Sequence, residues 1–122
     1  MIDAYVAGSF ALALEMVDDE VVWHGTIGGL DERRVAHGHR EVIQAFVENL
    51  QEWESHVLQA QRFIDADDRV VVFWHEEGRG QRSGAEVTTN TAVIYTVCAG
   101  RVVEVQGYMD RSEALRAVGL EE

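Results

Sequence analysis

The sequence predicts a single α+β domain in which helices pack on one face of a curved antiparallel sheet. Apolar residues recur at the helical spacing of three and four in the first half of the chain, and β-branched and aromatic residues dominate the second half. The 122 residues fit one domain, assigned to 1–122, and 47% of them are apolar, which is enough for a core. This order, helices before a meander of strands, is typical of an α+β fold.

Three helices are expected, around 8–17, 39–53 and 111–118. The second shows the clearest pattern, because its apolar residues form one stripe and its glutamates and glutamines lie on the other side. The third begins after Asp110, which forms a D-x-x-E capping signature with Glu113. The apolar stripe of the second helix consists of Val42, Ile43, Phe46, Val47, Leu50 and Trp53.

Five strands are expected between or after these helices. Gly28 and Gly29 mark a loop after the first strand, the polar residues 78–84 form a wide hairpin connection, and Ala99-Gly100 forms a tight turn. The predicted strands are 20–24, 59–64, 69–77, 86–98 and 101–109.

Composition and charge exclude several classes of partner. Ten basic residues against twenty-two acidic ones give a net charge of −12, which would repel a nucleic-acid backbone. The longest apolar runs are far shorter than the ~20 residues of a membrane span. A lone cysteine, Cys98, gives no internal disulfide, and the N-terminal residues lack the features of a secretory signal. We therefore expect a cytoplasmic protein that binds neither nucleic acid nor membrane.

Four segments, in this order, resemble the SnoaL-like family of the nuclear-transport-factor-two-like superfamily. They are DDEVVWHG at 18–25, Gly38 at the start of a helix, GRVV at 100–103 and YMDRSEAL at 108–115. The resemblance implies a cone-shaped α+β barrel with a deep, mostly apolar pocket between the helices and the concave face of the sheet. The superfamily includes polyketide cyclases, ketosteroid isomerases, epoxide hydrolases, dehydratases and proteins that only bind.

The resemblance therefore implies a pocket for a small apolar molecule, used by a cofactor-independent isomerase, cyclase or hydrolase. The alternatives are a non-catalytic binding module for such a molecule, or a dimer whose pocket is vestigial. The family often forms dimers through the convex face of the sheet. In strand 69–77 both alternating sets of side chains are apolar, so both faces need a cover. A second subunit over Val71 and Phe73 is the simplest cover for the outer face, and we expect a homodimer.

Two residues are candidates for catalysis. By the resemblance, His24 stands where the ketosteroid isomerases have their carboxylate base, and an imidazole can act as a general base at neutral pH. Asp110 stands near the aspartate that serves as the base of the SnoaL-like cyclases. The alternatives are structural: His24 as a hydrogen-bonded strand-end residue, and Asp110 as the cap of the last helix.

Strand alternation predicts which residues line the pocket. Placing His24 inward also places Val22 inward, and Val70, Val72 and Trp74 then share one face of their strand. Glu76 follows on that face, either as a pocket-mouth acid with a raised pKa or as a solvated charge. The remaining predicted lining residues are Trp23, Phe46, Trp53, Tyr95 and Val105.

No metal site is expected. His37 and His39 are the only close pair of histidines, and no cysteine or carboxylate stands near them at the spacing of metal ligands.

Overall fold

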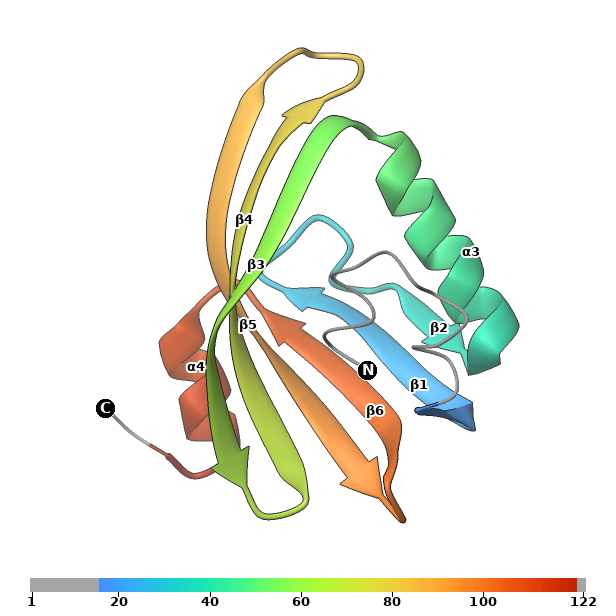
Figure 1. Ribbon diagram of the computed structural model, residues 1–122, viewed down its shortest axis with the longest axis vertical. Coiled ribbons are helices and arrows are strands. Elements are labelled where there is room, and N and C mark those ends of the chain that lie inside the picture. Colours follow the sequence, from blue (N-terminus) through green and yellow to red (C-terminus); the bar gives the residue numbers. More distant parts are fainter. Residues whose placement is uncertain (1–15, 121–122) are drawn as a thin grey trace.

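The computed structural model describes residues 16–120, which form one six-stranded sheet with a helix on each of its faces (Figure 1). The predicted α+β fold is confirmed. The elements are β1 (Val17–Ile27), β2 (Val35–His37), α3 (Gly38–Gln51), β3 (Trp53–Ala66), β4 (Arg69–Gly80), β5 (Glu86–Cys98), β6 (Arg101–Tyr108) and α4 (Arg111–Ala117).

The strand order is β2-β1-β6-β5-β4-β3. Every neighbouring pair of the described strands is antiparallel except β1 and β6, which run parallel. The expectation of an antiparallel sheet thus missed one pair. A tight turn forces its two strands to be antiparallel, whereas β1 and β6 are joined through the rest of the chain, so no turn sets their direction.

The element bounds agree with the sequence pattern at α3, β5, β6 and α4, and differ elsewhere. The β5–β6 hairpin closes over Ala99 and Gly100, whose φ angles of 52° and 79° match a turn with two left-handed residues. Trp53, predicted to lie in the second helix, instead begins β3. The predicted helix over 8–17 lies outside the described residues except at its end, where Val17 begins β1.

One hydrophobic core lies between the sheet and α3, on what we call the inner face. Val42 of α3 is fully buried, and Ala45 and Phe46 pack beside it. The sheet contributes alternate residues of each strand, which confirms that Val72, Trp74, Tyr95 and Val105 share this face. The buried residues of this core are Val17, Val21, Ala36, Val42, Val72, Trp74, Tyr95, Val102 and Val105.

A second core lies on the opposite, outer face, beneath α4. Val71 is fully buried and Phe73 is 8% exposed, because Ala114 and Leu115 of α4 pack against the same cluster. We expected a second subunit to supply this cover. The chain supplies it from its own last helix, so the apolar patch on which we based the homodimer does not exist at Val71 and Phe73. The homodimer itself stays a prediction.

Within residues 16–120, neither helix combines the length and the apolar character that crossing a bilayer would require.

The outer core makes a testable prediction about α4. Leu115 is 4% exposed and fills the outer core, so Leu115→Ala should lower the free energy of unfolding by about 2–5 kcal/mol through the cavity that it leaves. Leu120, which is 36% exposed, provides the control: Leu120→Ala should change the same quantity by less than about 0.5 kcal/mol. Urea denaturation measures both. Equal effects of the two substitutions would show that α4 does not cover the sheet as described.

Candidate functional site

The inner face carries an aromatic and aliphatic wall. Trp23 of β1 and Phe46 of α3 meet edge to face, with ring centroids 4.7 Å apart and planes at 85°. Trp74 and Tyr95 are buried in neighbouring strands, 3% and 5% exposed. Aromatic side chains of this kind form the walls of many small-molecule sites.

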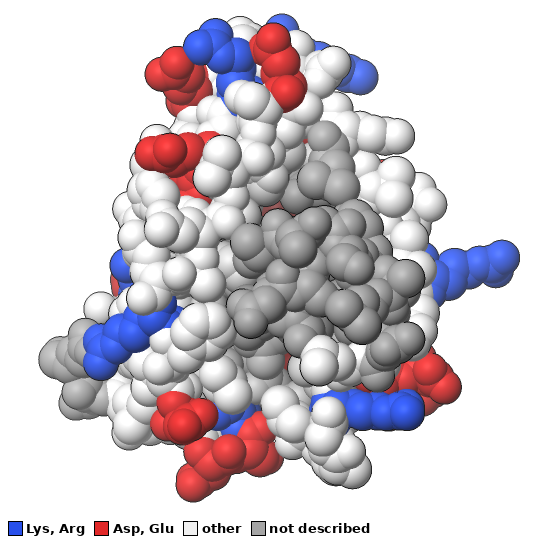
Figure 2. Space-filling model, in the orientation of Figure 1, with Lys and Arg blue, Asp and Glu red and all other residues white. Residues whose placement is uncertain are grey.

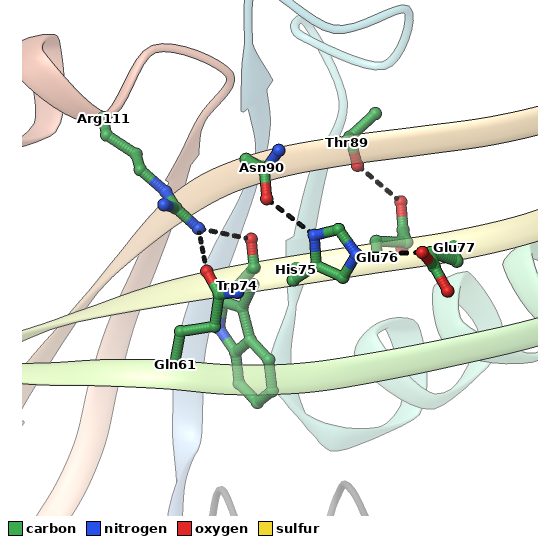
Figure 3. Close-up of polar contacts among 8 residues, drawn as sticks. All are labelled: Gln61, Trp74, His75, Glu76, Glu77, Thr89, Asn90 and Arg111. Carbon is green, nitrogen blue, oxygen red and sulfur yellow. Dashed lines mark hydrogen bonds and ion pairs between the residues drawn. The ribbon is translucent and has the colours of Figure 1, made fainter.

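A group of polar side chains continues this wall toward the β4–β5 turn. Glu76 lies two residues beyond Trp74 on β4, and alternation places it on the same inner face. Its Oε2 accepts a hydrogen bond from Nε2 of His56 on β3 at 2.7 Å, and its Oε1 accepts one from the Thr89 hydroxyl of β5 at 3.2 Å (Figure 3 shows the contact with Thr89). The side chains of His56 and Glu76 are only 12% and 25% exposed. Both oxygens of a half-buried carboxylate are therefore engaged.

The electrostatics of Glu76 differ from the sequence-based expectation. The hydrogen bond from His56 lowers the pKa of the Glu76 carboxyl below its usual 4.5, and the bond from Thr89 acts in the same direction. Burial alone would raise the pKa, as we expected, but it is the weaker effect here. Glu76 is thus an ionised carboxylate at neutral pH, and the direction of its shift is opposite to that of a pocket-mouth acid with a raised pKa.

Trp53 covers this pair. Its ring stacks on the His56 imidazole, with centroids 4.7 Å apart and planes at 11°. A Cβ atom at Gly78 would lie 2.5 Å from the Trp53 ring, so only glycine at 78 leaves room for the indole. The Trp53 Nε1 is buried without a hydrogen-bond partner. The indole therefore contributes its flat face to His56 and fixes the plane of the imidazole.

The outer face of the same strands carries a second polar group, which serves structure. His75 donates from Nδ1 to Asn90 Oδ1 at 2.7 Å, and its Nε2 lies 3.2 Å from Glu77 Oε1 (Figure 3). These two acceptors, Asn90 first, raise the pKa of His75 because the protonated ring can donate to both. With both ring nitrogens engaged, His75 has no lone pair directed at a ligand.

Arg111 ties α4 to the outer face. It donates to the main-chain oxygens of Thr91 and Trp74 at 3.1 and 3.0 Å and to the Gln61 side chain at 2.8 Å (Figure 3 shows the contacts with Trp74 and Gln61). Its guanidinium lies 4.6 Å from the centroid of the Phe73 ring. Thr91 directly precedes Ala92, where the pairing of β5 with β6 begins, and Gln61 lies where the register between β3 and β4 shifts. Arg111 therefore donates hydrogen bonds at two places where the regular pairing of the sheet is interrupted.

The predicted inward position of His24 is wrong. Trp23 pairs with the fully buried Val105 and packs on the inner core, so its neighbours Val22 and His24 point to the outer face. There His24 Nε2 lies 3.3 Å from Glu104 Oε2, and the two side chains are 31% and 53% exposed. Val22, predicted to line the pocket with His24, is likewise half-buried on the outer side.

Asp110 is the N-cap of α4, as the capping signature predicted. Its Oδ1 accepts a hydrogen bond from the Ser112 main-chain N–H at 2.8 Å. Because α4 packs on the outer face, the cap lies on the opposite side of the sheet from the aromatic wall. The structure therefore does not bring His24 and Asp110 into one site with the inner residues.

The remaining predicted lining residues lie on the inner side: Trp23, Phe46, Val70, Val72, Trp74, Tyr95 and Val105 belong to the inner core or pack against it. The enclosed cavity between them stays a prediction. Sequence reasoning missed His56 and Thr89. His56, Leu58 and Ala60 alternate on one face of β3, but His56 and Leu58 precede the predicted strand 59–64. This alternation can be recognised only when the strand is known to begin at Trp53.

A groove of about 340 Å³ lies elsewhere, between β2 and the first turns of α3. Its lining is Arg34, Val35, Ala36, Arg40, Glu41 and Gln44. Arg34 is occupied by Glu48 at 2.6 Å, and the groove shares no residue with the aromatic wall. Among the described residues, no three histidine, cysteine, aspartate or glutamate side chains are grouped so that they could hold a metal ion.

Comparisons with known proteins agree with the fold and name a family. A family model for the SnoaL-like domain matches residues 1–105. No curated protein sequence matches at a significant level. Similar solved structures include an NTF2-like protein of unknown function from Burkholderia pseudomallei K96243, with 20% identity, a TM-score of 0.75 and coverage of 96% of this chain and 90% of that one.

Two further structures have names that refer to chemistry. TerC, co-crystallised with polyporic acid, is 19% identical with a TM-score of 0.74, covering 95% of this chain and 90% of its own. A putative SnoaL-like polyketide cyclase from Jannaschia sp. CCS1 is 15% identical with a TM-score of 0.74, covering 94% and 81%. At these identities the likeness establishes the fold.

The lowered pKa of Glu76 predicts how stability depends on pH. Its ionised form contributes stability that is fully present above the unfolded value of 4.5 and is lost as the pH falls through the lower folded value. Glu76→Gln should therefore reduce the free energy of unfolding by about 1–3 kcal/mol at pH 7, and by less at pH 3, as measured by urea denaturation. The exposed Glu54 provides the control, since Glu54→Gln should change the free energy of unfolding by less than about 0.5 kcal/mol at pH 7. A loss at Glu76→Gln that is the same at both pH values would contradict the ionised pair.

Proposed function

Because the chain belongs to the SnoaL-like domain family, we propose that it is a cofactor-independent enzyme acting on a small, largely apolar molecule at the inner face of the sheet. The reaction is an isomerisation, cyclisation or hydrolysis by general acid–base chemistry. The observation that carries this proposal is the His56–Glu76 pair, a hydrogen-bonded histidine and carboxylate that directly continues the aromatic wall.

The aromatic wall supports an apolar ligand. Flat rings such as Trp23 and Trp74 bury large apolar areas and favour stacked or edge-to-face partners. Charged side chains gather mainly at the two ends of the molecule in Figure 2, whereas the described surface between them is mostly uncharged.

The charge distribution supports a neutral ligand. Both arginines of β4, a strand described over its full length, face outward: Arg69 donates to the Ala117 carbonyl of α4 at 3.3 Å, and Arg79 pairs with Glu86. An anionic ligand beside Glu76 would meet no arginine of β4, and it would approach a chain with a net charge of −12. The names of the similar structures, one with polyporic acid and one a putative polyketide cyclase, fit an organic ligand.

A non-catalytic binding module is the second candidate. It is favoured because the two residues predicted to be catalytic make structural contacts instead: His24 pairs with Glu104, and Asp110 caps α4. A protein of this kind would bind the apolar molecule without converting it. The His56–Glu76 pair favours the enzyme, because a histidine oriented by a hydrogen-bonded carboxylate is the usual arrangement of a general base.

Binding of a neutral apolar dye tests the location of the ligand. Nile red should bind saturably, with increased emission. Thr91 pairs with Trp74 on the inner face, so Thr91→Phe should fill that space and weaken binding at least about tenfold, which corresponds to about 1.4 kcal/mol. The control is Thr88→Phe, on the outer face of the same strand, which should leave binding unchanged.

Circular dichroism establishes that both variants are folded before they are compared. Absence of saturable binding, or equal loss of binding in the two variants, would contradict a ligand site on the inner face.

A further inference from the structure

We infer that His56 is the general base of this site, held in position by Glu76, Thr89 and Trp53, and that its Nδ1 takes the proton from the bound molecule. The inference rests on the proposed function and adds the residue and the atom that take the proton. It places the base on β3, away from both positions that the family resemblance suggested, His24 and Asp110.

The hydrogen-bond pattern selects His56 over Glu76 as the base. Glu76 accepts from His56 with one oxygen and from Thr89 with the other, so both of its oxygens are already used. A carboxylate can only accept, so the His56 Nε2 must carry the hydrogen between them. In the neutral ring Nδ1 then carries the lone pair, and no residue within 16–120 donates a hydrogen bond to it. As far as residues 16–120 are concerned, His56 Nδ1 is therefore available to take a proton.

Comparison with other described histidines supports this choice. His24 also pairs with a glutamate, but at 3.3 Å, on the outer face and with Glu104 53% exposed. His75 uses both ring nitrogens. His39 contacts the Val17 carbonyl at 2.9 Å and lies 3.8 Å from Asp19, a residue that is 82% exposed. His56 combines the shortest of these histidine–carboxylate contacts with a position on the inner face.

The surroundings of His56 suit the charge that forms during the reaction. When Nδ1 takes the proton, the substrate C–H bond breaks and its electron pair stays with the substrate. The positive charge on the imidazole lies against the Glu76 carboxylate and under the face of Trp53, both of which stabilise it. Return of the proton from Nδ1 to another carbon completes an isomerisation, with no oxidant, reductant or further reactant.

The rate at which a base in an apolar site removes a proton can be measured with a probe molecule, without knowledge of the natural substrate. The probe is 5-nitro-1,2-benzisoxazole, a flat neutral molecule. Removal of its C3 proton sends the C–H electron pair into a C≡N bond, breaks the N–O bond and leaves a coloured phenolate. The wild-type chain should convert it with saturation kinetics. His56→Ala and His56→Gln should each lower kcat/KM about 100-fold or more, and Glu76→Gln about tenfold, because a general base contributes factors of this size.

The control is His24→Gln, which removes the equivalent histidine–glutamate pair on the outer face and should leave the rate within about twofold. His56→Gln retains a donor for Glu76, so it keeps the test valid if His56→Ala fails to fold. Displacement of Nile red by the same probe measures binding separately from turnover. Saturable binding with equal turnover in the wild type and His56→Gln would overturn the assignment of the base while leaving the binding site intact. Absence of binding would overturn the proposed function and the inference together.

Discussion

Strand β4 is covered on both faces, and this constraint decides where the functional side chains of the sheet lie. Val72, Trp74 and Glu76 must point to the inner core, so the residues between them point to α4. A slip of one residue would bury Glu76 on the side of α4 and bring His75 beside the aromatic wall. Val71 and Phe73 are buried beneath α4, and Val72 is fully buried in the inner core, so a shift of β4 by one residue would disrupt both cores and its register is fixed.

The fixed register explains how an ionised carboxylate persists beside an apolar wall. Loss of water from a carboxylate costs free energy unless hydrogen bonds replace it. β4 lies between β3 and β5, and each of these strands supplies one donor to Glu76, from His56 and from Thr89. Three neighbouring strands thus hold one charge, and the imidazole is oriented as a result. The similar pair at His24 and Glu104 is more exposed and lies on the other face, so water can replace much of its interaction.

The sequence predicted the parts of the fold that local pattern governs and missed those set by distant pairing. The helix over 38–51, the turn at Gly100 and the Asp110 cap depend on nearby residues, and all three are present. The predicted apolar stripe of α3 is buried only in part: Val42 is 2% exposed, whereas Ile43 and Val47 are 38% and 41% exposed. The inward direction of His24 depended on how β1 pairs with β6, a parallel pairing with a register shift after Val17 that no local pattern reports. The outer face of β4 needs no second subunit at Val71 and Phe73, because the helix α4 returns to cover it. His56 was missed since β3 begins directly after α3, where the helical stripe obscures the strand period.

The tautomer of His56 is the most direct test of this account. Long-range ¹H–¹⁵N correlation spectra of the folded protein, with ¹⁵N-labelled histidine and at a pH where the ring is neutral, distinguish the two ring nitrogens. The account predicts that Nε2 carries the hydrogen, directed at Glu76, and that Nδ1 is bare. A ring protonated at Nδ1, or one that exchanges between the two tautomers as a solvent-exposed histidine does, would contradict the claim that Glu76 holds His56 as a base.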